Sequence, residues 1–184
     1  MPDPMNTSTV ESALRRLGAV LGDGPEIEIL LVGGAAGMIT GLLPPTRVTT
    51  DCDVMAYLPP DTMATVELAA AQVAGELGLA TNWLNSDVQI RVDALPSGWE
   101  QRKISAGRYG RLRVSAVSRP DLIAMKVLAG RDQDIEDLQA MRVRSDDVAF
   151  IENYLNTLAS KGTQRGQIYE ARELLASLEV YDHE

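Results

Sequence analysis

Residues 27–57 of this 184-residue chain read IEILLVGGAAGMITGLLPPTRVTTDCDVMAY, and this stretch predicts the fold. It begins with a short apolar run, Ile27–Val32, that has the length and β-branched content of a buried strand. Paired glycines at 33 and 34 end this run, and a helix of small residues is predicted to follow as far as Gly41. A second extended run then contains Asp51 and Asp53. The order of elements is therefore strand, tight turn, helix and strand.

The residue types in this stretch predict a site for phosphate and a metal ion. Alternate residues of a strand share a face, so Asp51 and Asp53 are expected to point the same way and Cys52 the other way. Two carboxylates this close repel each other unless a hard divalent cation such as Mg²⁺ or Mn²⁺ lies between them. Glycines at the turn allow a phosphate to approach the backbone closely. We therefore expect Mg²⁺ or Mn²⁺ as cofactor.

Composition excludes several other classes of function. A net charge of −9 argues against a protein that coats nucleic acid, although a local basic segment spans residues 102–113. The single cysteine excludes a disulfide framework and a Cys-based zinc site, and the single histidine, His183, lies close to the C-terminus. No apolar run approaches the ~20 residues of a membrane span, and no signal pattern opens the chain. We expect a cytoplasmic protein without membrane contact.

The spacing of apolar residues, with glycines and prolines as boundaries, predicts the remaining elements. Helices are expected near residues 7–21, 60–77, 119–129, 132–141, 145–160 and 164–178. Strands are expected up to residue 58 and at 88–95 and 111–117, with 83–87 irregular and 102–110 hairpin-like. The prediction is an α/β (α+β) fold with a mixed-sheet core at residues 1–118 and a C-terminal helical region at 119–184.

This order of parts resembles the nucleotidyltransferase fold of the polymerase-beta superfamily, whose pattern is a Gly-Gly or Gly-Ser turn, Asp-x-Asp, and a third carboxylate on a later strand. Asp93, on the polar face of the strand predicted at 88–95, holds the third place. The resemblance implies that Asp51, Asp53 and Asp93 hold Mg²⁺, that Asp93 helps to activate the acceptor, and that Gly33 and Gly34 hold phosphates. Because the commoner serine is replaced by Gly34, a side-chain contact from that position is absent.

A second motif, PDLIAMKVLAGRDQDIEDL at residues 120–138, resembles a C-terminal motif of the AbiEii/MenT-type nucleotidyltransferase-like toxins. The resemblance implies that Lys126 contacts a nucleotide phosphate and that Asp137 or Asp134 completes the site; the choice between these aspartates stays open. The competing interpretation is a solvated helix with ordinary ion pairs, such as Arg131 with Asp134.

Two further groups of residues have two interpretations each. Arg47 and Thr49 fit the family's Arg-x-Thr-x-Asp-x-Asp pattern, so Arg47 is either a phosphate contact or an ion-pair partner of the aspartates. The basic segment either contacts an RNA end or is plain surface charge. Its members are Trp99, Arg102, Lys103, Arg108, Arg111 and Arg113.

The resemblance implies a metal-dependent nucleotidyltransferase that moves an NMP from an NTP to an acceptor hydroxyl on a tRNA end or a protein. It also implies a toxin–antitoxin setting, with an antitoxin or other partner protein. The alternative is a non-catalytic nucleotide-binding or antitoxin-like regulatory protein on the same scaffold, for which the acidic charge suits a basic partner. Phosphotransfer by kinase-like toxins would use the same metal site.

Overall fold

The protein is described from a computed structural model that covers residues 3–88, 94–162 and 165–181. The chain divides into two compact units, and each is described by itself. The first unit consists of Met1–Asp93 with Arg102–Val117, and the second of Ala94–Gln101 with Ser118–Glu184. The second unit therefore takes a short segment from the middle of the chain.

The first unit is built on a mixed sheet with the strand order β3-β2-β1-β5-β4. The central strand β1 (Ile27–Val32) runs antiparallel to β2 (Cys52–Leu58) and parallel to β5 (Leu112–Ala116). Residues 102–110 were expected to be hairpin-like, but β4 (Ile104–Tyr109) is a single strand within them and forms its antiparallel hairpin with β5. Every residue of β1 is buried, which is the pattern of a strand covered on both faces.

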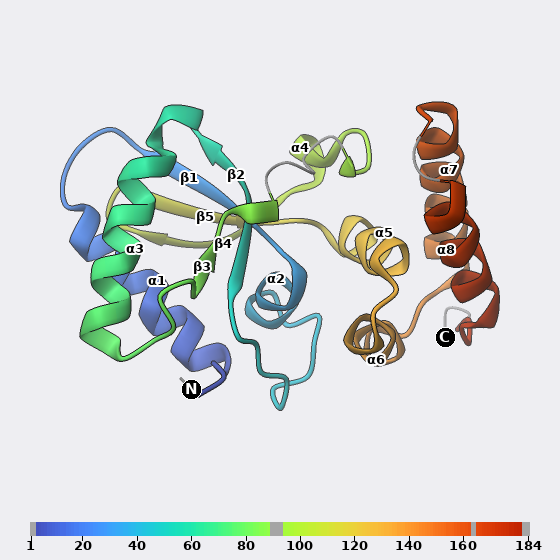
Figure 1. The fold of residues 1–184 in the computed structure, drawn as a ribbon, viewed down its shortest axis with the longest axis horizontal. Helices are drawn as coiled ribbons and strands as arrows, with labels where there is room; N and C mark the ends of the chain where they lie inside the picture. The colour runs from blue at the N-terminus through green and yellow to red at the C-terminus, as the bar shows by residue number, and fades with distance from the viewer. Residues whose placement is uncertain (1–2, 89–93, 163–164, 182–184) are drawn as a thin grey trace. The chain divides into compact units, whose positions relative to one another are not determined.

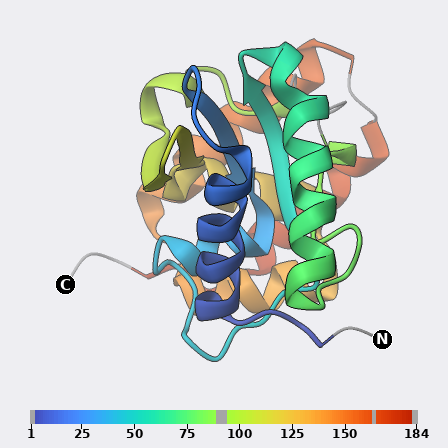
Figure 2. The ribbon, with the colours of Figure 1, turned by 90° about the vertical axis from the view of Figure 1, so that its left-hand side faces the viewer.

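Helices α1 (Thr7–Leu21) and α3 (Met63–Leu77) contact each other and lie side by side over the sheet (Figure 2). The side chain of Asn6 accepts a hydrogen bond from the Thr9 amide at 2.9 Å and so caps the first turn of α1. Helix α2 (Gly33–Ile39) follows β1 directly and contacts both β1 and β2. A short 3₁₀ turn, η1 (Pro60–Thr62), precedes α3 (Figure 1).

The structure differs from the prediction at residues 83–87, which were expected to be irregular. Strand β3 (Leu84–Asn85) lies in this stretch and pairs in parallel with the start of β2. The fully buried Trp83 anchors it, because its indole N–H donates to the carbonyl of Ala70 at 2.9 Å. Two residues are too few to show an alternating pattern. The strand predicted at 88–95 falls mostly on residues 89–93, which lie outside the described part of the chain.

The described residues of the second unit form helices, with one isolated β-bridge between Arg144 and Tyr181. The helices are α5 (Arg119–Ala129), α6 (Asp132–Met141), α7 (Ser145–Ser160), α8 (Arg165–Ser177) and the short α4 (Trp99–Arg102), which ends one residue into the first unit. Helix α5 contacts each of α6, α7 and α8. The hydroxyl of Tyr154 on α7 donates to the carbonyl of Ala94, which fastens the mid-chain segment to this bundle.

The α/β (α+β) fold class is confirmed, since the described elements are a mixed five-stranded sheet and a set of helices. Within the described ranges, no helix has both the length and the apolar character needed to span a bilayer.

Candidate nucleotide and metal site

The glycine turn is set by the junction of β1 and α2. Gly33 is the first residue of α2 and has φ of +66°, a left-handed value that favours glycine. A Cβ atom at Gly33 would lie 3.0 Å from Oδ2 of Asp53, so the backbone here passes directly beside that carboxylate. The sheet register explains the proximity, because Val32 at the end of β1 pairs with Asp53 at the start of β2.

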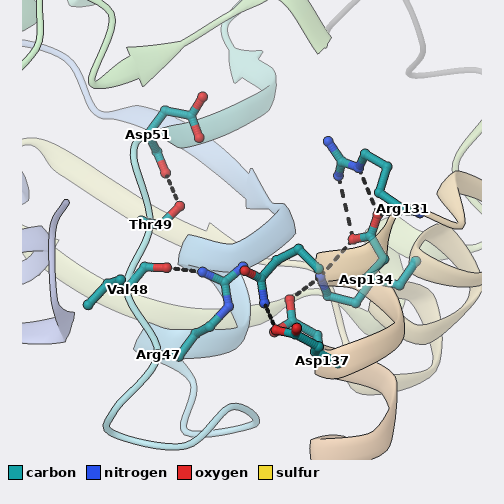
Figure 3. Close-up of polar contacts among 10 residues, drawn as sticks. Arg47, Val48, Thr49, Asp51, Arg131, Asp134 and Asp137 are labelled. Carbon is teal, nitrogen blue, oxygen red and sulfur yellow. Dashed lines mark hydrogen bonds and ion pairs between the residues drawn. The ribbon is translucent and has the colours of Figure 1, made fainter.

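The Asp-x-Asp pair lies where β2 begins. Asp51 immediately precedes the strand and Asp53 is its second residue, and both side chains are half-buried. The hydroxyl of Thr49 donates to the carbonyl of Asp51 at 2.9 Å, which fixes the backbone before the strand (Figure 3). Oδ1 of Asp53 accepts a hydrogen bond from Nδ2 of Asn85 at 2.9 Å.

Arg47 and Thr49 lie against the second glycine of the turn. A Cβ atom at Gly34 would be 3.1 Å from Nη2 of Arg47 and 3.3 Å from Oγ1 of Thr49. The guanidinium of Arg47 also donates to the carbonyl of Val48 (Figure 3). Thr49 is held in place by two backbone hydrogen bonds with Met5, at 2.7 and 2.9 Å. Residues far apart in the chain thus meet at one end of β1 and β2.

Six of the predicted site residues lie in the described part of the first unit. The structure brings five of them together: Gly33, Gly34, Arg47, Thr49 and Asp53. The sixth, Asp51, lies two residues before Asp53 on the same segment. Asp93, the predicted third carboxylate, lies outside the described residues. Among residues 3–88, 94–162 and 165–181, no three His, Cys, Asp or Glu side chains gather as a metal-binding group. Asp51 and Asp53 are therefore the carboxylates that the described residues of this segment contribute, two positions apart in the chain.

Lys126, Asp134 and Asp137 form a buried cluster within the second unit. Nζ of Lys126 donates to Oδ1 of Asp134 at 3.1 Å and to Oδ2 of Asp137 at 2.6 Å. The three side chains are only 3–4% exposed. Arg131, whose side chain is 73% exposed, donates from Nε to Oδ2 of Asp134 at 2.7 Å (Figure 3). The carboxylates compensate the buried ammonium, so these contacts join α5 to α6.

The comparison with protein families decides the class of the protein. The model of a family described as "Nucleotidyltransferase of unknown function" (DUF6036) matches residues 9–181, which is almost the whole chain. The chain belongs to this nucleotidyltransferase family. No curated protein and no solved structure gives a significant match.

Three members of the basic segment in this family member are paired with acidic groups of the first unit. Lys103 donates to Oε1 of Glu28 at 2.6 Å, and Arg108 and Arg113 contact Glu26 at 3.0 and 3.2 Å. Arg111 donates to the carbonyl of Leu21 at 3.0 Å. These contacts agree with the interpretation as structural and surface charge, while contact with an RNA end stays a prediction.

Cys52 is fully buried and lies between the two aspartates in sequence. Burial raises the pKa of its thiol far above the usual range, and the negative charges of Asp51 and Asp53 raise it further. Because the thiolate is the nucleophilic form, Cys52 belongs to the core and not to the chemistry of the site.

Asn85 is the residue of this site that sequence reasoning missed. It belongs to the two-residue strand β3 and lies opposite Asp53 in the register of β2 and β3. Its contact with Asp53 joins residues 32 positions apart, and no local pattern signals such a contact. The nearest available signal is the buried Trp83, which marks the segment as part of the core.

Proposed function

We propose that the protein is a metal-dependent nucleotidyltransferase that moves an NMP from an NTP to an acceptor hydroxyl. The observation that supports this best is the close approach of the left-handed Gly33 to Oδ2 of Asp53, at the paired ends of β1 and β2. A turn without side chains beside a carboxylate pair suits a triphosphate, since phosphate oxygens need both close backbone approach and charge compensation.

The donor set fits Mg²⁺ or Mn²⁺ bound together with a nucleotide. Mg²⁺ takes oxygen ligands and is usually held in proteins by one or two carboxylates together with substrate phosphates and water. Asp51 and Asp53 supply the carboxylates, and Asp93 is the third by family resemblance. A cation bound at these carboxylates would compensate the negative charge that builds up on the phosphates during transfer.

The chain's own residues bind and orient the nucleotide in this proposal. Gly33 and Gly34 allow the phosphates to approach the backbone, and Arg47 and Thr49, which lie against Gly34, add a cation and a hydroxyl. The resemblance to AbiEii/MenT-type toxins adds Lys126 as a phosphate contact, with Asp137 or Asp134 as its acidic partner. The resemblance to the polymerase-beta superfamily implies that Asp93 helps to activate the acceptor.

The acceptor and the biological setting are implied by the resemblance. We propose a tRNA end or a protein as acceptor and a toxin–antitoxin pair as the setting. We also propose the cytoplasm as the location. The net charge of −9 supports one further candidate, a regulatory protein that binds nucleotide and a basic partner without turnover.

The test uses the purified protein with each α-³²P-labelled NTP, Mg²⁺ and total tRNA. We expect label on RNA or on protein, and a loss of at least ~100-fold for Asp53→Asn, as when a preorganised electrostatic group is removed. Asp61→Asn is the matched control, because Asp61 is an exposed aspartate in η1, beyond the opposite end of β2.

Each outcome separates the candidates. Unchanged transfer by Asp53→Asn would exclude the proposed site. Absence of label with every NTP, together with nucleotide binding by calorimetry, would favour the regulatory protein. Label transferred only from γ-³²P-labelled ATP would identify phosphotransfer instead.

A further inference from the structure

A hollow on the surface of the second unit is lined by none of the residues assigned to the proposed reaction. It encloses ≈ 380 Å³ of empty space, part of which is open to solvent. One wall is the segment 95–97, and the other is a single face of α7, whose lining residues recur at helical spacing. The α7 residues of this wall are Phe150, Asn153, Tyr154, Thr157, Leu158 and Lys161. Small-molecule pockets hold roughly 300–1,000 Å³, so the size of this α7 hollow suits a small ligand.

The base of the α7 hollow is apolar and preformed. Leu95, Tyr154 and Leu158 are buried residues of its lining. The hydroxyl of Tyr154 donates to the carbonyl of Ala94, so the segment that carries Leu95 is held against α7. The hydroxyl of Thr157 is also engaged, because it donates to the carbonyl of Asn153 at 2.9 Å. The base therefore presents mainly hydrocarbon and the face of one aromatic ring, which suits a planar ring in a ligand.

The rim of the α7 hollow carries three exposed polar side chains, those of Ser97, Asn153 and Lys161. Within residues 3–88, 94–162 and 165–181, none of these three side chains makes a hydrogen bond or an ion pair. The other two lysines of the chain, Lys103 and Lys126, are both paired with carboxylates. The rim thus offers a positive charge, an amide and a hydroxyl to a ligand.

Lys161 is also the C-cap residue of α7, where a cation can compensate the negative end of the helix dipole. The last turn is already capped by backbone groups. The amide of Lys161 donates to the carbonyls of Thr157 and Leu158, and the amide of Gly162 donates to that of Ala159, each at 3.2 Å. Because these carbonyls have partners, the ammonium group, at the end of a flexible side chain, can serve an anion at the rim.

We propose that the α7 hollow binds a small aromatic carboxylate, with its ring on the apolar base and its carboxylate on the ammonium group of Lys161. Asn153 and Ser97 supply further hydrogen bonds at the rim. Among the described residues that line the hollow, none carries a carboxylate that would repel the ligand. This site lies outside the proposed reaction and does not depend on it.

The test compares two probes of nearly equal shape, 1-naphthoate and the uncharged 1-naphthamide, on the full ¹⁵N-labelled chain. Titration followed by amide chemical shifts gives both the location and the dissociation constant. We expect shifts in segments 95–97 and 150–161. Naphthoate should bind about tenfold more tightly than naphthamide, as expected for a hydrogen bond between two charged groups.

Lys161→Met removes the charge but keeps a long side chain, so it should weaken naphthoate about tenfold and leave naphthamide unchanged. Arg172→Met is the matched control. It removes one charge from an exposed position of the same unit, where Arg172 donates to Asn156 at 2.8 Å and does not line the hollow. Ser97→Phe adds bulk at the exposed rim and should weaken both probes.

A loss of naphthoate affinity confined to Lys161→Met, with shifts in the α7 hollow, supports the inference. Equal affinity for the two probes, an equal loss in Arg172→Met, or shifts elsewhere in the chain would overturn it. So would a wild-type protein that binds no naphthoate at millimolar concentration. None of these results depends on whether the protein transfers label from an NTP, so the inference and the proposed function fail separately.

Discussion

Gly33 has two constraints that can be separated by experiment. Its φ of +66° disfavours any side chain, and a Cβ atom there would lie 3.0 Å from Oδ2 of Asp53, so that this carboxylate would have to shift. Gly41 has the same kind of backbone, with φ of +72°, but nothing lies within 4 Å of a Cβ atom there. A comparison of substitutions at Gly33 and Gly41 therefore separates the effect of backbone strain from the effect of crowding the Asp53 carboxylate.

We predict that Gly33→Ala and Gly41→Ala each lower the free energy of unfolding by about 1–2 kcal/mol, the cost of a left-handed alanine. Only Gly33→Ala should also reduce nucleotide transfer, by roughly 100-fold, because it displaces Asp53. Urea unfolding and the labelled-NTP assay measure the two effects. Equal activity in the two variants would contradict the crowding of Asp53.

At the residue scale, the sequence predicts what depends on near neighbours in the chain. The glycine turn and Asp51–Asp53 are recognisable because a strand ends in Gly33–Gly34 and another begins within one short helix. Asn85 could not be recognised in this way. Its role depends on pairing between β2 and β3, and pairing of such a short strand is decided by the burial of Trp83 and not by any repeat in the sequence.

At the scale of elements, the cluster at α5 and α6 illustrates a buried ion network. Lys126 lies between two carboxylates that are i and i+3 on the next helix, and the three side chains are almost fully buried. Removal of the lysine alone would leave two buried carboxylates without the ammonium group that lies between them. The network therefore makes the docking of these two helices sensitive to one side chain.

We predict that Lys126→Met lowers the free energy of unfolding by about 3–5 kcal/mol, as expected when one partner of a buried ion pair is lost. Neutralising both carboxylates in that background, with Asp134→Asn and Asp137→Asn, should restore part of this loss. Arg131→Ala is the control, since the side chain of Arg131 is 73% exposed whereas that of Lys126 is 4% exposed, so its removal should cost less stability than Lys126→Met. A Lys126→Met protein as stable as the wild type would refute the role of the cluster in stability.

The elements themselves follow closely from the sequence, but their arrangement does not. The helix of residues 119–129 is predicted by its apolar spacing, by Pro120 in its first turn and by Gly130, which adopts a left-handed C-cap. The strand order β3-β2-β1-β5-β4 places β5 next to β1 although 79 residues separate Val32 from Leu112. Such pairing depends on which buried faces fit together, and a local pattern contains no information about it.

At the scale of the whole molecule, Glu28 links three strands of the sheet. Its side chain is 11% exposed, lies on β1, and accepts hydrogen bonds from Lys103, just before β4, and from Ser115 on β5. Burial alone would raise its pKa, but the hydrogen bonds from Lys103 and Ser115, with the charge of Arg113, outweigh burial and hold the pKa below its ordinary value.

A carboxyl group whose pKa is lowered on folding stabilises the folded state while it is ionised. This stabilisation is complete above the ordinary glutamate pKa of 4.5 and disappears as pH falls through the lower pKa of the folded state. We predict that Glu28→Gln is less stable than the wild type near neutral pH, and that the difference shrinks below about pH 4.5. Urea unfolding at a series of pH values measures it.

Glu26→Gln is the control for the pH experiment, because Glu26 also contacts arginines of the hairpin but its side chain is 40% exposed. Surface pairs of this kind contribute about 1 kcal/mol or less, so the stability of this variant should stay close to that of the wild type at each pH. A constant difference between Glu28→Gln and the wild type down to pH values well below 4.5 would show that Glu28 acts through packing and not through its charge. In that case the shape of the Glu28 side chain, and not its charge, would link the strands.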